Sequence, residues 1–177
     1  MIAIRAARPA DADAIAAIYA PHAETGDATF EEVAPDAAEM ARRMTTGLGW
    51  LVAEAEDRVV GYAYASPFHP RAGYRWTVET SVYVAAAAHG TGVGKRLYAA
   101  LIAGLTDRGY AQAVARIALP GEASLALHRS LGFEPVGVQR AVGWKNGRWI
   151  DVALWQRALA DLPSPPPEPR VRQFRGA

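Results

Sequence analysis

The segment HGTGVG at residues 89–94, directly ahead of an amphipathic stretch, constrains the fold more than any other part of the chain. Its glycines stand at alternate positions, where a backbone without Cβ atoms lets a ligand approach closely. The residues that follow, Val93, Leu97 and Leu101, recur every four positions and predict a helix that packs one face on a core. We therefore expect a loop that opens a helix and directs the free N–H groups of the first turn at an anion.

The charges at the start of this helix also favour an anionic ligand. Lys95 and Arg96 stand at the helix end that cations destabilise, by about 0.3–1 kcal/mol each. A Walker A loop requires Ser or Thr where this chain has Arg96, and the dinucleotide fingerprint requires Gly where it has Lys95. The remaining interpretation is a phosphate or pyrophosphate held by backbone N–H groups and cations. The alternative is a tight turn that leads into a surface helix.

Length and composition predict one globular domain. The chain has 177 residues, of which 51% are hydrophobic, so it can bury a full core. We place the domain at residues 1–162. The segment that follows, residues 163–177, is rich in proline, and we expect it to be a mobile tail.

The charge balance and the missing residue types exclude several classes of protein. A formal net charge of +1 without a long basic stretch argues against nucleic-acid binding. Because the chain has no cysteine, it has neither a disulfide nor a thiolate nucleophile, and its 4 histidines show no metal-ligand spacing. The N-terminus lacks an apolar signal region, and no stretch of about 18 apolar residues is present to span a bilayer. We expect a cytoplasmic protein that binds neither metal nor membrane.

The order of strand-like and helix-like runs predicts an α/β architecture of the α+β type. Two N-terminal helices are followed by strand-like runs at residues 50–56, 58–66 and 75–84, and the short turn between the first two makes the sheet antiparallel at its start. After the glycine-loop helix come a strand, a helix and two strands joined by Asn146-Gly147, a type I′ hairpin signal. With the strand at residues 2–7, the chain has about seven strands and about four helices.

The strand at residues 75–84 has two chemically different faces. A period of two places Arg75, Thr77, Glu79, Ser81 and Tyr83 on one face, which is polar. An edge strand could expose this face to water, but the short connection to the glycine loop brings the strand end beside the bound anion. Glu79 is then placed to take a proton from an ammonium group, because partial enclosure raises the pKa of a carboxyl. Arg75 is placed to grip a carboxylate or another planar anion.

Four segments together, WTVETSVYV, HGTGVGKRLY, LALHRSLGFEPVG and WKNGRWIDVALWQ, resemble the GNAT superfamily of acyl-CoA N-acyltransferases. Within it they resemble the branch that acetylates phosphinothricin and methionine sulfoximine. The superfamily signature Q/R-x-x-G-x-G/A opens the helix that binds the coenzyme A pyrophosphate, and HGTGVG keeps both of its glycine positions. The resemblance covers roughly residues 2–157 and implies the GNAT fold, with a mixed central sheet, and acetyl-CoA as the co-substrate.

The resemblance also implies which residues bind coenzyme A. The pantetheine arm would pair with the backbone of Val82, Tyr83 and Val84. A bulge near Ser81 would change the alternation of the strand, so the face that carries the Tyr83 side chain is not fixed by the sequence. The pyrophosphate would be held by His89, Gly90, Thr91, Gly92, Val93, Gly94 and Lys95. On the next helix, Ser124 would contact the coenzyme or cap the helix start. Gly121 stands where the branch usually has Asn.

For the chemistry, the resemblance implies direct transfer within a ternary complex, with Glu79 as the base and backbone N–H groups near Val84 as donors to the oxyanion. His128 stands where many members have the tyrosine that protonates the leaving thiolate, and it would be either this acid or a packed structural residue. The acceptor would be a small amino acid analogue such as phosphinothricin, methionine sulfoximine or methionine sulfone. Its contacts would be Phe30, Glu31, Arg75, Trp76, Thr77 and Glu79.

Two other functions stay open from the sequence: acetylation of a protein N-terminus or lysine, and a catalytically weak acyl-CoA-binding module. Separately, the cluster of Trp144, Trp149 and Trp155 around the terminal hairpin predicts a homodimer, because it offers more aromatic surface than one small core needs.

Overall fold

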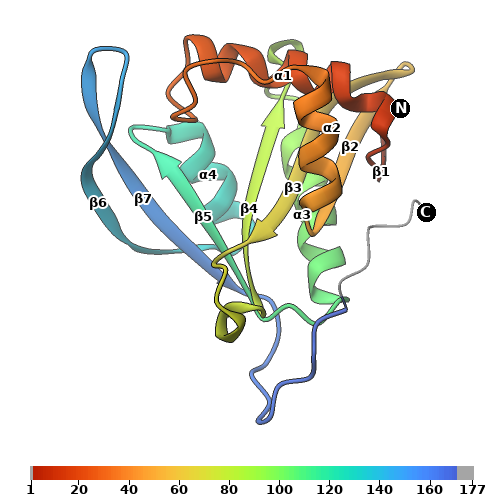
Figure 1. The fold of residues 1–177 in the computed structure, drawn as a ribbon, viewed down its shortest axis with the longest axis vertical. Helices are drawn as coiled ribbons and strands as arrows, with labels where there is room; N and C mark the ends of the chain where they lie inside the picture. The colour runs from red at the N-terminus through yellow and green to blue at the C-terminus, as the bar shows by residue number, and fades with distance from the viewer. Residues whose placement is uncertain (1, 171–177) are drawn as a thin grey trace.

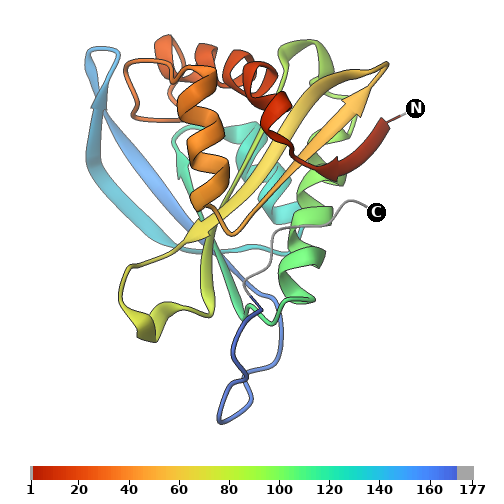
Figure 2. The same cartoon turned by 45° about the vertical axis from the view of Figure 1, so that its right-hand side comes forward.

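The fold is built on a twisted seven-stranded sheet with helices on both faces (Figure 1, Figure 2). The computed structural model describes residues 2–170. The strands are β1 (Ile2–Ala6), β2 (Gly49–Ala55), β3 (Arg58–Pro67), β4 (Thr77–Val84), β5 (Gln112–Ala118), β6 (Glu134–Lys145) and β7 (Arg148–Ala158). Their order is β1-β2-β3-β4-β5-β7-β6, and among the strand pairs of residues 2–170 only β4–β5 is parallel. The predicted mixed sheet with an antiparallel start is confirmed.

The α-helices of the described chain cover the sheet in two pairs. One face carries α1 (Ala12–Glu24) and α2 (Ala37–Thr46), and the other carries α3 (Val93–Thr106) and α4 (Glu122–Ser130). The start of α2 is capped by Asp36, whose carboxylate accepts a hydrogen bond of 2.8 Å from the Glu39 backbone N–H. Both α3 and α4 start at left-handed glycines, Gly92 with φ 80° and Gly121 with φ 40°.

Each face of the sheet has its own hydrophobic core. Leu97, Leu101 and Leu105 of α3 are fully buried, which confirms the four-residue period. On the opposite face, Ile15 of α1 and Met40 of α2 pack against the aromatic side of β2 and β3. Burying one such side chain contributes about 1.5–3 kcal/mol, so these stripes hold the helices to the sheet.

Strands β4 and β5 part soon after they pair. Residues Thr77–Glu79 pair with Gln112–Val114, although both strands continue beyond this point. On its other side β4 pairs with β3 as far as Val84 without a register shift, so there is no bulge and Tyr83 lies on the same face as Glu79. The edge of β4 that faces β5 is therefore free of strand pairing beyond Glu79 in the described structure.

The start of β4 differs from the prediction. The strand begins at Thr77 rather than Arg75, because residues 72–74 form a 3₁₀ turn that the Arg75 N–H closes on the Ala72 carbonyl at 3.2 Å. The described part of the tail, residues 163–170, contains neither helix nor strand, and residues 171–177 lie outside the described residues. The mobility expected for the tail stays a prediction.

The terminal hairpin confirms one prediction and corrects another. Asn146 and Gly147 have φ of 51° and 73°, as a type I′ turn requires. Trp155 is buried in the core of β7, whereas Trp144 and Trp149 are exposed and meet edge to face with ring centroids 5.3 Å apart. The exposed aromatic cluster therefore contains two of the three predicted tryptophans, because Trp155 faces the core.

Candidate active site

A cleft lies where β4 and β5 part. One end is a cavity of about 340 Å³ whose lining includes Thr80, Ser81, Arg116 and His128. The other end is a cavity of about 440 Å³ at the start of α3, and its lining includes Val84, His89, Gly92 and Lys95. Both cavities are lined by Ala28, Val82, Tyr83 and Ser124. These shared residues place the two cavities side by side, and the two together form the cleft.

The glycine loop presents bare backbone to this cleft. Gly90 and Gly92 have φ of 75° and 80°, and, apart from each glycine and its chain neighbours, no described residue has a heavy atom within 4 Å of the positions that their missing Cβ atoms would take. His89 ties the loop to the end of β4, since its Nε2 lies 2.9 Å from the Val84 carbonyl oxygen. The loop keeps its shape through its own contacts and leaves room beside the backbone for a ligand.

The two cations at the start of α3 point in different directions. Lys95 lines the larger cavity, whereas the Arg96 guanidinium donates a hydrogen bond of 3.2 Å to the Ile2 carbonyl. An anion at this helix start would meet the free N–H groups of the first turn together with the Lys95 ammonium. The arrangement suits a pyrophosphate without a contribution from Arg96.

Glu79 stands at the point where the strands part. It is the last β4 residue paired with β5, and its side chain is 28% exposed. Its Oε2 lies 3.6 Å from Nε of Arg116, a residue of the cleft lining that the sequence did not single out. A carboxylate here can accept a proton from an amine in the cleft, and the guanidinium favours one orientation of the carboxylate.

His128 is tied into a buried chain of hydrogen bonds. Its Nδ1 lies 2.7 Å from the Ser124 carbonyl oxygen, so Nδ1 carries the proton and donates it, and Nε2 accepts from the Tyr98 hydroxyl at 3.1 Å. The Tyr98 hydroxyl lies 2.7 Å from the Thr80 hydroxyl. Burial lowers the pKa of His128, which keeps the ring neutral, and raises the pKa of Tyr98.

Tyr98 is not recognisable as a site residue from the sequence, because it lies on the apolar stripe of α3, where an aromatic side chain is normally core. The only available signal is Thr80, a hydroxyl on the face of β4 that turns toward this helix. Thr80 and His128 line the cleft, and the buried Tyr98 hydroxyl connects these two residues through its hydrogen bonds.

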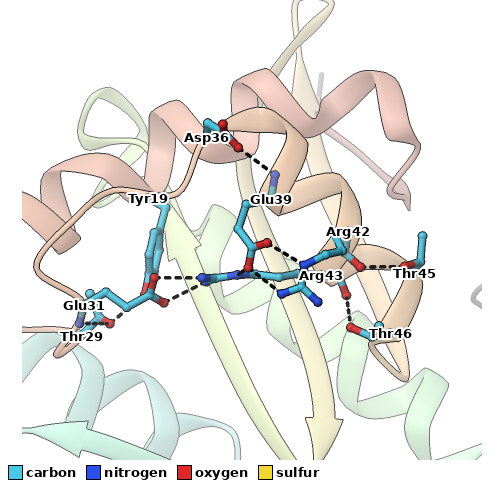
Figure 3. A network of polar contacts seen from close by, with 9 residues as sticks. All are labelled: Tyr19, Thr29, Glu31, Asp36, Glu39, Arg42, Arg43, Thr45 and Thr46. Atoms are coloured by element: carbon cyan, nitrogen blue, oxygen red, sulfur yellow. Dashed lines mark hydrogen bonds and ion pairs between the residues drawn. The ribbon is translucent and has the colours of Figure 1, made fainter.

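The loop between α1 and α2 forms a wall of the cleft, but through different residues than predicted. Asp27 lines the smaller cavity, and Ala28 lines both. The Glu31 carboxylate accepts hydrogen bonds from Arg43 Nη1 at 2.8 Å and Nη2 at 2.9 Å, and from the Tyr19 hydroxyl at 2.8 Å (Figure 3). These bonds, chiefly those from Arg43, lower the pKa of Glu31. Glu31 therefore fastens the loop to α2.

Phe30, the other predicted residue of this loop, covers the backbone of β6. A Cβ atom at Gly143 would lie 2.2 Å from its ring, so glycine is required there for the loop to close over the strand. Phe30 remains 40% exposed.

A buried lysine fastens the same loop from the other side. Lys145, at the end of β6, is 4% exposed, and its ammonium donates to the carbonyl oxygens of His22 at 3.0 Å, Thr29 at 2.8 Å and Glu31 at 2.9 Å. Next to it, the Asn146 amide donates to the Asp27 carboxylate at 2.9 Å. The burial of Lys145 is not predictable from the sequence, because a lysine beside a hairpin turn is usually solvated.

Arg75 and Trp76 lie upstream of the cleft, at the start of β4. The Arg75 guanidinium stacks 3.8 Å above the Trp76 ring, and it donates to the Glu168 carboxylate from Nε at 2.8 Å and from Nη2 at 2.6 Å. Thr77 is the first residue paired with β5. Arg75 stands four positions before Glu79 and ahead of the strand, so the extended-strand spacing of roughly 3.3 Å per residue sets only an upper bound of about 13 Å on the separation of their Cα atoms.

Within residues 2–170, no three His, Asp or Glu side chains gather closely enough to hold a metal ion. Over the same residues, no helix is both long and apolar enough to cross a membrane.

Comparisons with known proteins agree with this geometry. Residues 4–154 match the family model of the acetyltransferase (GNAT) domain. The chain is 47% identical over 161 residues to the phosphinothricin N-acetyltransferase of Alcaligenes faecalis, covering 88% of this chain and 82% of the relative. It is 39% identical over 168 residues to the L-methionine sulfoximine/L-methionine sulfone acetyltransferase of Pseudomonas aeruginosa, covering 92% of this chain and 98% of the relative.

Among solved structures, the chain is similar to a GNAT superfamily phosphinothricin acetyltransferase from Sinorhizobium meliloti in complex with acetyl-CoA. The TM-score is 0.86 at 43% sequence identity, and the match covers 90% of this chain and 89% of that chain.

Proposed function

The chain belongs to the GNAT acetyltransferase family, and on that premise we propose that it acetylates the amine of a small amino acid analogue of the phosphinothricin, methionine sulfoximine or methionine sulfone kind. The acetyl donor is acetyl-CoA. The observation that carries the proposal is the cleft at the parting of β4 and β5, which runs from a helix start suited to an anion as far as Arg116, the residue that contacts the Glu79 carboxylate at the point of parting. The two relatives supply the class of acceptor.

The cleft fits the two parts of coenzyme A. Beyond Glu79 the free edge of β4 offers backbone N–H and carbonyl groups of Val82, Tyr83 and Val84 to the amides of the pantetheine arm. The backbone of residues 89–94 and the Lys95 ammonium would bind the pyrophosphate. The open space beside Gly90 and Gly92 is what a phosphate needs for close approach to the chain.

Proton removal from the acceptor falls to Glu79. Its carboxylate takes a proton from the ammonium, and the free amine attacks the thioester carbonyl carbon, after which the carbon–sulfur bond breaks. The Arg116 guanidinium, with its Nε 3.6 Å from the carboxylate, steadies the orientation of the Glu79 side chain while the acceptor binds. Because the chain has no cysteine, no thiolate of the enzyme carries the acetyl group, and transfer within a ternary complex relies on the positioning of both substrates.

The departing thiolate would meet Ser124 and His128. The Ser124 hydroxyl lines both cavities and lies 3.4 Å from His128 Nδ1. Because the imidazole N–H points at the Ser124 oxygens, the hydroxyl proton is left free to donate to sulfur. A coenzyme thiol resembles a cysteine, with a pKa near 8.5, so one such donor suffices to stabilise it as it leaves. Tyr98 fixes the imidazole in this tautomer.

The acceptor would lie between Glu79 and the start of β4. Its amine faces Glu79, its anionic group reaches toward Arg75, and Trp76 and Thr77 flank it. Phe30 and Glu31 act indirectly, since they hold the loop that carries Asp27 and Ala28 into the cleft. Phe30 and Glu31 thus shape the wall of the site without taking part in the chemistry.

We also propose that the enzyme is a homodimer of the cytoplasm. Strand β6 is an edge of the sheet and exposes Val136, Val138, Val142 and Trp144, next to Trp149 of β7. An apolar edge strand of this kind is normally covered by a partner. The cytoplasmic location follows from the need for acetyl-CoA, a metabolite of the cell interior.

A thiol-release assay tests the proposed function. Free coenzyme A is detected by a thiol reagent, and the protein adds no background because it has no cysteine. We expect turnover with phosphinothricin, methionine sulfoximine or methionine sulfone, and none with short peptides. Turnover with peptides alone would assign the enzyme to protein acetylation, and coenzyme binding without any turnover would make it a binding module.

A further inference from the structure

The C-terminal segment places a carboxylate on the arginine that the proposed function assigns to the acceptor. Two Arg75 donors, Nε and Nη2, bind the two oxygens of Glu168, and the third, Nη1, donates to the Ala72 carbonyl at 2.9 Å. Parallel bonds of this kind are how a guanidinium binds a carboxylate or a phosphinate. Glu168 thus occupies Arg75 as an anionic group of a substrate would.

Backbone contacts on both sides of Glu168 hold the segment in place. The Trp76 indole N–H donates to the Pro167 carbonyl at 2.7 Å, and the Arg170 N–H donates to the Arg108 carbonyl at 2.8 Å. The chain therefore returns from β7 to run beside the start of β4 and the end of α3 (Figure 2). Through these contacts Glu168 is presented to Arg75 at a high local concentration.

The ion pair is weak enough to exchange. The side chains of Arg75 and Glu168 are 41% and 69% exposed, and exposed ion pairs contribute little to stability because water screens them. The stacking of Arg75 on Trp76 keeps the guanidinium in position when its partner leaves. An anion from solution can therefore replace Glu168 without rebuilding the site.

We infer that Glu168 competes with the acceptor for Arg75 and thereby sets the selectivity between acceptors with and without a distal anion. The inference rests on the proposed function. Arg75 stands ahead of β4, four positions before Glu79, and therefore suits the far end of the acceptor, because the α-carboxylate is bonded to the same carbon as the amine that faces Glu79. Phosphinothricin ends in an anionic phosphinate and must displace Glu168, whereas methionine sulfone ends in a neutral sulfone.

The experiment compares kcat and KM for both acceptors in Glu168→Gln, with Asp161→Asn as a matched loss of charge in the same exposed segment. We expect Glu168→Gln to lower the KM for phosphinothricin up to about fivefold, as loss of an exposed pair allows, with kcat unchanged. The KM of Glu168→Gln for methionine sulfone should stay at the wild-type value. For Asp161→Asn, kcat and KM should stay at wild-type values with both acceptors. In an Arg75→Ala background the effect of Glu168→Gln should vanish.

An unchanged ratio of the two KM values in Glu168→Gln, or the same gain in the Arg75→Ala background, would overturn the inference. If the wild type acetylates neither acceptor, the proposed function fails, and a measurement without turnover decides the inference. The indole N–H signal of Trp76 in ¹H–¹⁵N spectra, assigned with Trp76→Phe, should move on truncation after residue 162 and move the same way on titration with phosphinothricin. If phosphinothricin does not shift the Trp76 indole N–H signal, then an anion from solution does not displace Glu168 from Arg75, and the inference is wrong.

Discussion

Replacing Lys145 with methionine would remove the fastening between the terminal hairpin and the loop that walls the cleft. The ammonium makes three hydrogen bonds to backbone carbonyls, and a bond to a charged group contributes about 1.5–3 kcal/mol. Against this gain stands the cost of burying the ammonium, which is several kcal/mol. Together these contributions predict that Lys145→Met lowers the free energy of unfolding by about 3 kcal/mol, because methionine fills the space but leaves three carbonyls unpaired.

Urea unfolding followed by circular dichroism measures this loss, and thermal unfolding should show a Tm lower by about 6–12 °C for a chain of this size. The matched control is Arg148→Gln, which removes an exposed contact of the same hairpin with Asp27 and should cost less than about 1 kcal/mol. In Lys145→Met the KM values of both substrates should rise, because Ala28 of the loosened loop lines both cavities. A stability within about 0.5 kcal/mol of wild type would refute the reasoning.

Three further predictions follow from the same structure. Gly92→Asp should weaken coenzyme A binding about tenfold or more in calorimetric titration, because it adds a like charge and strains a left-handed backbone, whereas Gly73→Asp, at an open site with ordinary φ, should not. Burial lowers the pKa of His128 below 6.5, so its neutral form contributes stability that is present above pH 6.5 and is lost as the pH falls through the folded-state pKa. Urea unfolding should therefore show a smaller loss of stability below pH 6.5 in His128→Gln than in wild type. Light scattering should give about twice 18.9 kDa for the wild type and a monomer for Trp144→Ser/Trp149→Ser, while a monomeric wild type would contradict the dimer.

Much of the fold was predictable because its signals are local. The four-residue period of α3, the type I′ turn at Asn146-Gly147 and the alternation of β4 each depend on neighbouring residues. The glycine loop and Glu79 were found in the same way, since one short connection joins them. Their position at the parting of β4 and β5 required the structure, because that parting depends on strands far apart in the sequence.

The missed residues share a different cause. Tyr98, Arg116 and Lys145 act through partners 18 to 123 positions away in the chain, and their own surroundings in the sequence are those of a core residue, a strand residue and a turn residue. Glu168 was assigned to a mobile tail on composition alone. Its contact with Arg75 depends on the path by which the chain returns across the bottom of the sheet.

The assignment of Glu79 as the base is tested by the turnover of Glu79→Gln with phosphinothricin and saturating acetyl-CoA, followed through release of the coenzyme thiol. The glutamine keeps the shape of the side chain and loses the proton acceptor. We expect kcat to fall by roughly 10²–10⁴-fold with unchanged coenzyme A affinity, which is the usual contribution of a positioned general base. Turnover near the wild-type rate would contradict the account, because the amine would then lose its proton without Glu79.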